Sequence, residues 1–216
     1  MNKTNFISIV RPYSMTSLER IECLYDSLEY IRQNDIPGDF IECGVWKGGN
    51  ILGIAEYLSF HKMTERKIYA FDTYSGMTTP EEVDVDHQGN NAKNIVNQPH
   101  ILCYASLQDV KNNVSKTSFP QDNIFYIVGD VCETLKEKNN IPQHISLLRL
   151  DTDWYQSTKT ELEILFPNLN SNGILIVDDY GHWEGSKRAV HEYFGDKISI
   201  LEKIDYTGVR LFKNKL

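Results

Sequence analysis

Five short apolar segments alternate with helical or loop segments along most of the chain, and this alternation restricts the possible folds more than any other feature of the sequence. Near-continuous apolar strands separated by helices are typical of a mostly parallel sheet covered by helices on both faces. We therefore expect an α/β protein with a doubly wound, Rossmann-like sheet. The five segments are DFIECGV at 39–45, KIYAFDT at 67–73, NIFYIVGD at 123–130, ISLLRLD at 145–151 and GILIVDD at 173–179.

The C-terminal part of the chain has a different pattern. The segments ISILEKI (198–204) and GVRLFKN (208–214) flank the turn sequence DYTG, which is a hairpin signal. A hairpin here adds antiparallel strands at the edge of the sheet and brings the expected total to seven. No linker interrupts the pattern, so residues 1–216 are expected to form a single domain.

Residues 1–36 are predicted to form a helical segment at the edge of this domain. Thr16 and Glu19 have the spacing of a capping box, and apolar residues follow at helical spacing up to Ile31, before Pro37. Such an amphipathic helix suits either a lid over a binding site or an interface in a homo-oligomer.

The segment from 74 to 99 is polar and acidic, and it contains glycine. It is long for a plain connection between a strand and a helix. We expect either a lid or substrate loop, or a solvated loop with no role in binding.

Each predicted core strand ends in an acidic residue. In open parallel sheets, ligands bind outside the carboxyl ends of the strands, where helix N-termini and loops converge. The acids at these ends are therefore the candidate site residues. They are Glu42, Asp72, Asp130 after Gly129, Asp151 with Asp153, and Asp178 with Asp179.

The first strand runs into a glycine turn that favours one kind of cofactor. Glu42, Gly44 and Gly48 fit Glu-x-Gly-x-x-x-Gly, and not the Gly-x-Gly-x-x-Gly that brings a dinucleotide pyrophosphate close to a helix. Asp72, at the end of the second strand, suits two ribose hydroxyls. Together these residues resemble the S-adenosylmethionine site of class I methyltransferases, although a tight turn and a solvated acid would give the same pattern.

The acids after the fourth and fifth strands indicate a metal ion. Asp151 and Asp178 are 27 residues apart, about one helix and one strand, so both face the same point above adjacent strand ends. With Asp179 they make three converging carboxylates, which repel one another unless a cation neutralises them. Oxygen ligands without a histidine pair or a Cys-x-x-Cys pair favour Mg²⁺ or another hard divalent cation over zinc. In the alternative reading, Asp153 and Thr158 only cap the next helix.

The charge and the apolar pattern exclude several classes of function. The formal net charge of −8 disfavours broad contact with nucleic acid or with an anionic membrane surface. No apolar run approaches the roughly 20 residues that a membrane span needs, and the N-terminus lacks the apolar region of a signal peptide. We therefore expect a cytoplasmic protein, and the resemblance to a methyltransferase site implies a small-molecule or glycan acceptor.

Four segments, in order, resemble the macrocin O-methyltransferase family, whose members methylate sugar hydroxyls. The resemblance runs from residue 15 to residue 194. It implies a class I methyltransferase fold, S-adenosylmethionine as methyl donor, and dependence on a divalent metal, usually Mg²⁺. The segments are MTSLERIECLYDSLEYIRQNDIPGDFIECGVWKGGN (15–50), FDTYSGM (71–77), LLRLDTDWYQSTKTELEILFPNL (147–169) and GILIVDDYGHWEGSKRAVHEYF (173–194).

By match to the family motifs, the metal ligands are Asp151, Asp178 and Asp179, and the general base is Asp153. His182 is the alternative base. The resemblance also carries over a set of cofactor residues, of which the last two lie where the adenine edge is usually read. They are Glu42, Gly44, Gly48, Asp72, Gly129 and Asp130.

These residues predict an O-methyltransferase that acts on a sugar or a glycosylated acceptor. A metal that ligates a hydroxyl lowers its pKa and directs it toward the sulfonium methyl, while a carboxylate takes the proton. Three other classes stay open: a metal-dependent enzyme that methylates a catechol or other small diol, a dinucleotide enzyme, which the glycine spacing disfavours, and a non-catalytic nucleoside-binding module.

Overall fold

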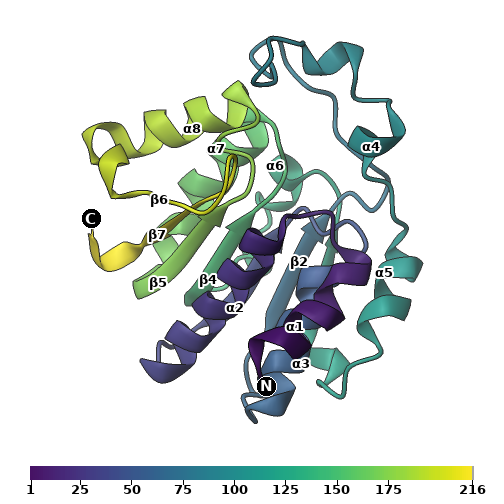
Figure 1. The fold of residues 1–216 in the computed structure, drawn as a ribbon, viewed down its shortest axis with the longest axis vertical. Helices are drawn as coiled ribbons and strands as arrows, with labels where there is room; N and C mark the ends of the chain where they lie inside the picture. Colours follow the sequence, from purple (N-terminus) through teal and green to yellow (C-terminus); the bar gives the residue numbers. More distant parts are fainter. Residues whose placement is uncertain (216) are drawn as a thin grey trace.

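A seven-stranded sheet in the order β3-β2-β1-β4-β5-β7-β6 runs through the molecule (Figure 1). The computed structural model describes residues 1–215, except for the side chains of residues 99, 100 and 215. Strands β1 to β5 pair in parallel, and β7 runs antiparallel to both β5 and β6. The predicted fold class is confirmed. The strands are β1 Asp39–Cys43, β2 Ile68–Asp72, β3 Ile124–Val128, β4 Ile145–Leu150, β5 Leu169–Val177, β6 Glu202–Lys203 and β7 Val209–Phe212.

Helices cover both faces of the sheet, which requires the strands to be apolar on both sides. On one face α1 packs on α2 and α3, and α3 packs on α5; on the other, α7 packs on α6 and α8 (Figure 1). A short helix, α4, lies in the loop beyond β2. The helices are α1 Lys3–Val10, α2 Leu18–Gln33, α3 Gly49–Phe60, α4 Pro99–Leu102, α5 Leu107–Val114, α6 Val131–Thr134, α7 Tyr155–Leu165 and α8 Glu184–Phe194.

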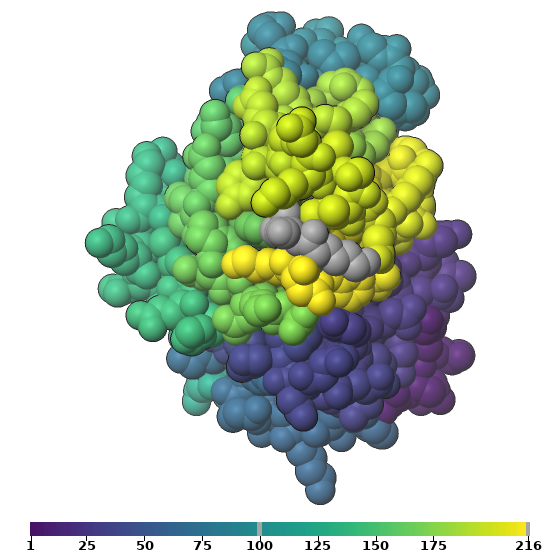
Figure 2. All heavy atoms as spheres, turned by 90° about the vertical axis from the view of Figure 1, so that its left-hand side faces the viewer, coloured from purple at the N-terminus to yellow at the C-terminus, as the bar shows by residue number. Residues whose placement is uncertain are grey.

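Neighbouring residues of each strand belong to two separate hydrophobic cores. Phe40 and Leu147 point into the core beneath α1, α2 and α3, whereas Ile41 and Leu148 point into the core beneath α7 and α8. This division follows from the two-residue period of a strand. The C-terminal hairpin extends the second core, and Figure 2 shows the C-terminal residues (yellow) lying between α8 and α2.

Three local features differ from the sequence prediction. The N-cap of α2 is Ser17, whose side chain accepts a hydrogen bond from the Arg20 backbone N–H, and not Thr16. The predicted helical segment 1–36 is divided into two helices, because Lys3–Val10 form a helix of their own before the one that the apolar spacing indicated. Of the predicted strand at 198–204, only Glu202 and Lys203 pair with β7, and residues 198–200 belong to a 3₁₀ helix.

The segment from 74 to 99 is fastened to the body of the protein and is not simply solvated. Ala92 packs against Trp154 and Trp183 in a small third core. The buried carboxylate of Asp84 accepts the backbone N–H of Tyr155 at 2.8 Å, at the start of α7, where a helix leaves its N–H groups unpaired. Asp84 therefore caps this helix from a distant loop. Thr158 does not cap it, contrary to the alternative reading, because α7 begins at Tyr155 and Thr158 lies inside it.

Candidate functional site

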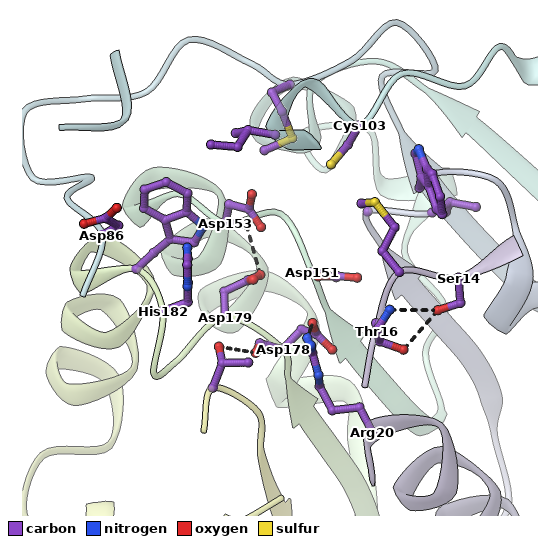
Figure 3. Close-up of a pocket in the computed structure, with 18 of the residues that line it drawn as sticks. Ser14, Thr16, Arg20, Asp86, Cys103, Asp151, Asp153, Asp178, Asp179 and His182 are labelled. Atoms are coloured by element: carbon purple, nitrogen blue, oxygen red, sulfur yellow. Dashed lines mark hydrogen bonds and ion pairs between the residues drawn. The ribbon is translucent and has the colours of Figure 1, made fainter. Parts of the chain in front are cut away.

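A cavity of about 670 Å³ opens at the carboxyl ends of β1, β4 and β5, as expected for an open parallel sheet. Figure 3 shows it with the strand-end carboxylates at its centre. The N-terminal segment contributes Tyr13, Ser14, Met15, Thr16 and Arg20 to the wall. The loop after β2 and the C-terminal hairpin complete it, so segments from both ends of the chain enclose one space.

The glycine turn after β1 forms one side of the cavity. Gly44 has a φ of 84°, and a Cβ there would lie 1.9 Å from the carbonyl oxygen of Asp151. Only glycine therefore allows the turn to pass so close to the end of β4. Gly48 also has a left-handed φ, of 82°, and it precedes α3 without lining the cavity itself.

Asp72 holds this turn in place. Its carboxylate accepts backbone N–H bonds from Val45 at 2.6 Å, Trp46 at 3.1 Å and Tyr74 at 2.7 Å. Burial nevertheless raises the pKa of Asp72 above its ordinary value, since the three bonds only partly offset desolvation. A carboxylate has about four acceptor sites, so Asp72, which lines the cavity, retains capacity for a hydroxyl donor.

Glu42 carries a buried oxygen that no described residue satisfies. Its Oε1 accepts from Asn50 and from Arg149, each at 2.7 Å, whereas Oε2 has no partner within residues 1–215. Burial raises the pKa of Glu42 to about 7, with a partial offset from Arg149. An unpaired buried acceptor beside a cavity suits a ligand that brings an N–H or a positive charge.

Gly129 and Asp130 lie beside the end of β2 and are not among the cavity-lining residues. The Gly129 backbone N–H donates to the Asp72 carbonyl at 3.0 Å. Asp130 caps α6 by accepting the backbone N–H of Cys132 at 2.8 Å. Both residues therefore make local contacts that support the rim next to Asp72.

Three carboxylates meet at the centre of the cavity: those of Asp151, Asp153 and Asp179, with one oxygen of each within 4.8 Å of the others. Asp153 has a left-handed backbone, φ 67°, and its N–H donates to Asp179 at 3.3 Å. Burial, reinforced by the neighbouring charges, raises the pKa of Asp153 to about 7 and that of Asp179 well above its ordinary value. Such a group is the oxygen-rich, net negative arrangement that a hard divalent ion neutralises.

Asp178 is not a member of this group, although it lies next to Asp151, and it pairs with two arginines. Arg149, buried within β4, and Arg20, from α2, each form an ion pair with one oxygen of Asp178. Burial raises the pKa of Asp178 to about 6, and Arg149 is the main opposing influence. Arg149 also pairs with Asp151 at 2.6 Å, so it lies at the centre of the acidic strand ends.

His182 lies at the opposite wall from the glycine turn. Its Nδ1 is 3.2 Å from the hydroxyl of Tyr206, and its ring centroid is 4.9 Å from that of His87. Burial lowers the pKa of His182, and the neighbouring His87 lowers it further. The ring therefore belongs to an aromatic group beside the carboxylates.

Four residues of this site escaped the sequence prediction: Arg20, Arg149, His87 and Tyr206. Arg149 left a signal, because a charged residue inside the apolar run ISLLRL is costly unless acids surround it. The other three come from a helix, a loop and a hairpin turn, with no pattern that links them to the strand ends.

Among the described helices, none has the length and apolar character needed to span a membrane.

Comparisons with known proteins agree with one another. The sequence model of the macrocin-O-methyltransferase family matches residues 10–213. The 8-demethyl-8-(2,3-dimethoxy-α-L-rhamnosyl)-tetracenomycin-C 4'-O-methyltransferase of Streptomyces olivaceus is 30% identical over 202 residues, which cover 91% of this chain and 74% of that protein. The mycinamicin III 3''-O-methyltransferase of Micromonospora griseorubida is 28% identical over 201 residues, with 91% and 77% covered. The solved structure of the O-methyltransferase NovP superposes with a TM-score of 0.80 at 26% identity, covering 93% of this chain and 82% of that one.

Proposed function

Because the chain belongs to the macrocin O-methyltransferase family, as its motifs suggested, we propose that it methylates a hydroxyl of a sugar or glycosylated small molecule. The methyl donor is S-adenosylmethionine, and a divalent cation assists the transfer. Membership makes the chain an O-methyltransferase. The sugar acceptor is supported by the names of the relatives, which act on glycosylated tetracenomycin and mycinamicin. The proposed metal is supported by one observation, the convergence of Asp151, Asp153 and Asp179 inside the cavity.

The cofactor fits the side of the cavity formed by the glycine turn. Asp72 retains acceptor capacity for a ribose hydroxyl, and the unpaired Oε2 of Glu42 suits the amino group of the methionine portion. Gly44 keeps the floor of this side free of side chains. When bound, S-adenosylmethionine supplies the electrophilic methyl group; Gly48, Gly129 and Asp130 support the surrounding turns.

Asp151 and Asp179 are the proposed metal ligands, because they belong both to the family motif and to the observed cluster. The identity of the third metal ligand and that of the general base depend on each other, because Asp153 can fill either role. If Asp153 takes the proton from the acceptor hydroxyl, Asp178 must turn from its two arginines toward the ion. If Asp153 is the third ligand, His182 is the remaining base. A bound Mg²⁺ supplies Lewis-acid activation of the hydroxyl.

Two variants separate these choices. In the first case, Asp153→Asn retains Mn²⁺ affinity and lowers turnover by about 100-fold or more, the usual contribution of a general base. In the second, Asp153→Asn weakens Mn²⁺ binding, while Asp178→Asn leaves it near that of the unchanged protein. Isothermal titration with Mn²⁺ and a turnover assay on the same preparations distinguish the two. His182→Gln identifies the base in the second case.

Residues 1–36 are proposed as a wall of the acceptor side. Ser14, Met15 and Thr16 line the cavity, and Arg20 connects α2 to Asp178. This contact supports a role in closing the site. The alternative role of an interface in a homo-oligomer involves the outer face of the same helices.

The function is tested by following S-adenosylhomocysteine release with a panel of glycosides and a catechol. The proposal expects release that depends on a glycoside, stops with EDTA and resumes with Mg²⁺. Methylation of the catechol alone would contradict the sugar acceptor. Glycoside methylation that persists in EDTA would contradict the metal and leave the methyltransferase unchanged.

A further inference from the structure

Three ring side chains from distant parts of the sequence meet on one wall of the cavity: His87, His182 and Tyr206, here called the aromatic shelf. The ring centroid of His87 lies 4.9 Å from that of His182 and 6.0 Å from that of Tyr206. The Tyr206 hydroxyl lies 3.2 Å from Nδ1 of His182. All three residues line the cavity, and Tyr206 remains 59% exposed, so a face of its ring is free for a ligand.

The backbone around the aromatic shelf is firmly held. Asp86 accepts the backbone N–H groups of Gln88 and Asn90, each at 2.8 Å, which fixes the turn that presents His87. The turn that presents Tyr206 is closed by Asp205, which accepts the N–H of Gly208 at 2.7 Å. The loop that carries His182 touches the Tyr206 turn, because a Cβ on Gly181 would lie 2.2 Å from the Tyr206 carbonyl oxygen.

The aromatic shelf adjoins the carboxylates on the side away from the glycine turn. The His182 backbone N–H donates to the carbonyl of Asp179 at 3.0 Å, so the aromatic shelf begins one turn of the chain after the carboxylates. Figure 3 shows His182 and Asp86 on one side of Asp179, with Ser14 and Thr16 across the cavity. A molecule held here has one edge at the carboxylates.

The charge of the cavity restricts what such a molecule can be. Among the described residues, seven acids line the cavity, and the only lysine or arginine is Arg20. Arg20 is already paired with Asp178 and, at 2.9 Å, with Asp205. Apart from the divalent ion proposed at the carboxylates, a diphosphate group bound here would find no free cationic side chain among the described residues of the wall.

We propose that the aromatic shelf is the acceptor subsite, and that it binds the ring of an uncharged glycoside rather than the sugar of a nucleoside diphosphate. The proposal rests on the sugar methylation proposed above. The C–H face of a sugar ring packs on the exposed face of Tyr206, because an aromatic ring offers a large apolar surface. Ring nitrogens of His87 and His182 exchange hydrogen bonds with sugar hydroxyls.

The test uses saturation-transfer NMR on the protein saturated with S-adenosylhomocysteine and Mg²⁺. The probes are methyl glycosides of common hexoses and 6-deoxyhexoses. Tyr206→Ala is expected to weaken binding of the preferred glycoside by about fivefold or more, whereas Tyr206→Phe, which keeps the ring, retains most of it. Tyr104→Ala is the matched control, since Tyr104 is 57% exposed and does not line the cavity. The Kd for S-adenosylhomocysteine is unchanged in all three variants.

Three results would overturn the subsite: equal binding by Tyr206→Ala and the unchanged protein, no binding of any methyl glycoside, or tighter binding of thymidine diphosphate rhamnose than of methyl rhamnoside. The last of these would leave sugar methylation standing and place the acceptor elsewhere in the cavity. Failure of the proposed function gives a different result, namely a glycoside that binds on Tyr206 without any S-adenosylhomocysteine release in the turnover assay.

Discussion

At the scale of single residues, Arg149 determines whether the acidic ends of the strands are tolerated. It is 3% exposed and pairs with Glu42, Asp151 and Asp178. Removal of one partner from a buried ionic group leaves charges that water cannot reach. The sequence predicted the acids from their position after apolar strands, but it did not predict how they divide between Arg149 and a metal. That division depends on side-chain directions and on Arg20, which is 158 residues from Asp178.

Arg149→Met is therefore expected to destabilise the fold by about 3–5 kcal/mol, the usual cost of breaking a buried ion pair. Urea denaturation followed by circular dichroism measures the loss. The control is Arg188→Met, because Arg188 is exposed, with a surface ion pair to Glu192 at 2.8 Å and a contact over the Tyr155 ring. Equal stability of the two variants would contradict the central role of Arg149.

Glu161 provides a pH-dependent prediction. It is fully buried on α7, and burial raises its pKa from 4.5 to about 8. The folded protein therefore keeps a proton that the unfolded chain releases, so this group lowers stability as pH rises from about 4.5 toward 8. Glu161→Gln resembles the protonated form and escapes this loss. The melting temperature of the variant, relative to the unchanged protein, should be higher at about pH 8 than at about pH 5.5. A difference that is constant with pH would contradict the assignment.

At the scale of elements, the sequence predicts those whose pattern is local. The five parallel strands were foreseen because each is a continuous apolar run, and the glycine turn because Gly44 has no alternative there. Within the predicted helical segment 1–36, the separate helix Lys3–Val10 was not distinguished because its apolar face is short, with Phe6 and Val10 as its buried residues. The first residue of α2 was misplaced by one, because Thr16 and Ser17 are both good N-caps and only the contact between Ser17 and Asp205 separates them.

The loop after β2 depends on a cap that the sequence could not reveal, since Asp84 lies 71 residues before Tyr155. Asp84→Ala is expected to speed amide exchange in residues 78–98 by about fivefold or more, because a lost cap of about 1 kcal/mol or more frees this loop first. Hydrogen-exchange mass spectrometry measures the effect. Glu82→Ala in the same loop is the control, because its exposed side chain pairs only with Asn91 and Lys93. Unchanged exchange in the Asp84 variant would show that the third core alone fastens the loop.

At the scale of the whole molecule, ligands that bind only the folded state should raise its stability. S-adenosylhomocysteine at about 100 times its Kd adds about 2.7 kcal/mol, which corresponds to a rise of roughly 5–10 °C in a domain of this size. Mn²⁺ adds a second increase. Asp179→Asn should lose the Mn²⁺ increase and keep the other, whereas Asp196→Asn, an exposed control, keeps both. Loss of both increases in the Asp179 variant would mean that Asp179 supports the fold and not the ion.

The contact between α2 and the C-terminal hairpin affects when the site can form during synthesis on the ribosome. Ser17 donates to Asp205 across 188 residues, and Arg20 contacts the same carboxylate. The α2 side of the site is therefore completed only after residue 205 has left the exit tunnel, although the sheet that supports it has already been translated. A chain that ends before Asp205 consequently lacks this contact and the part of the site that it completes.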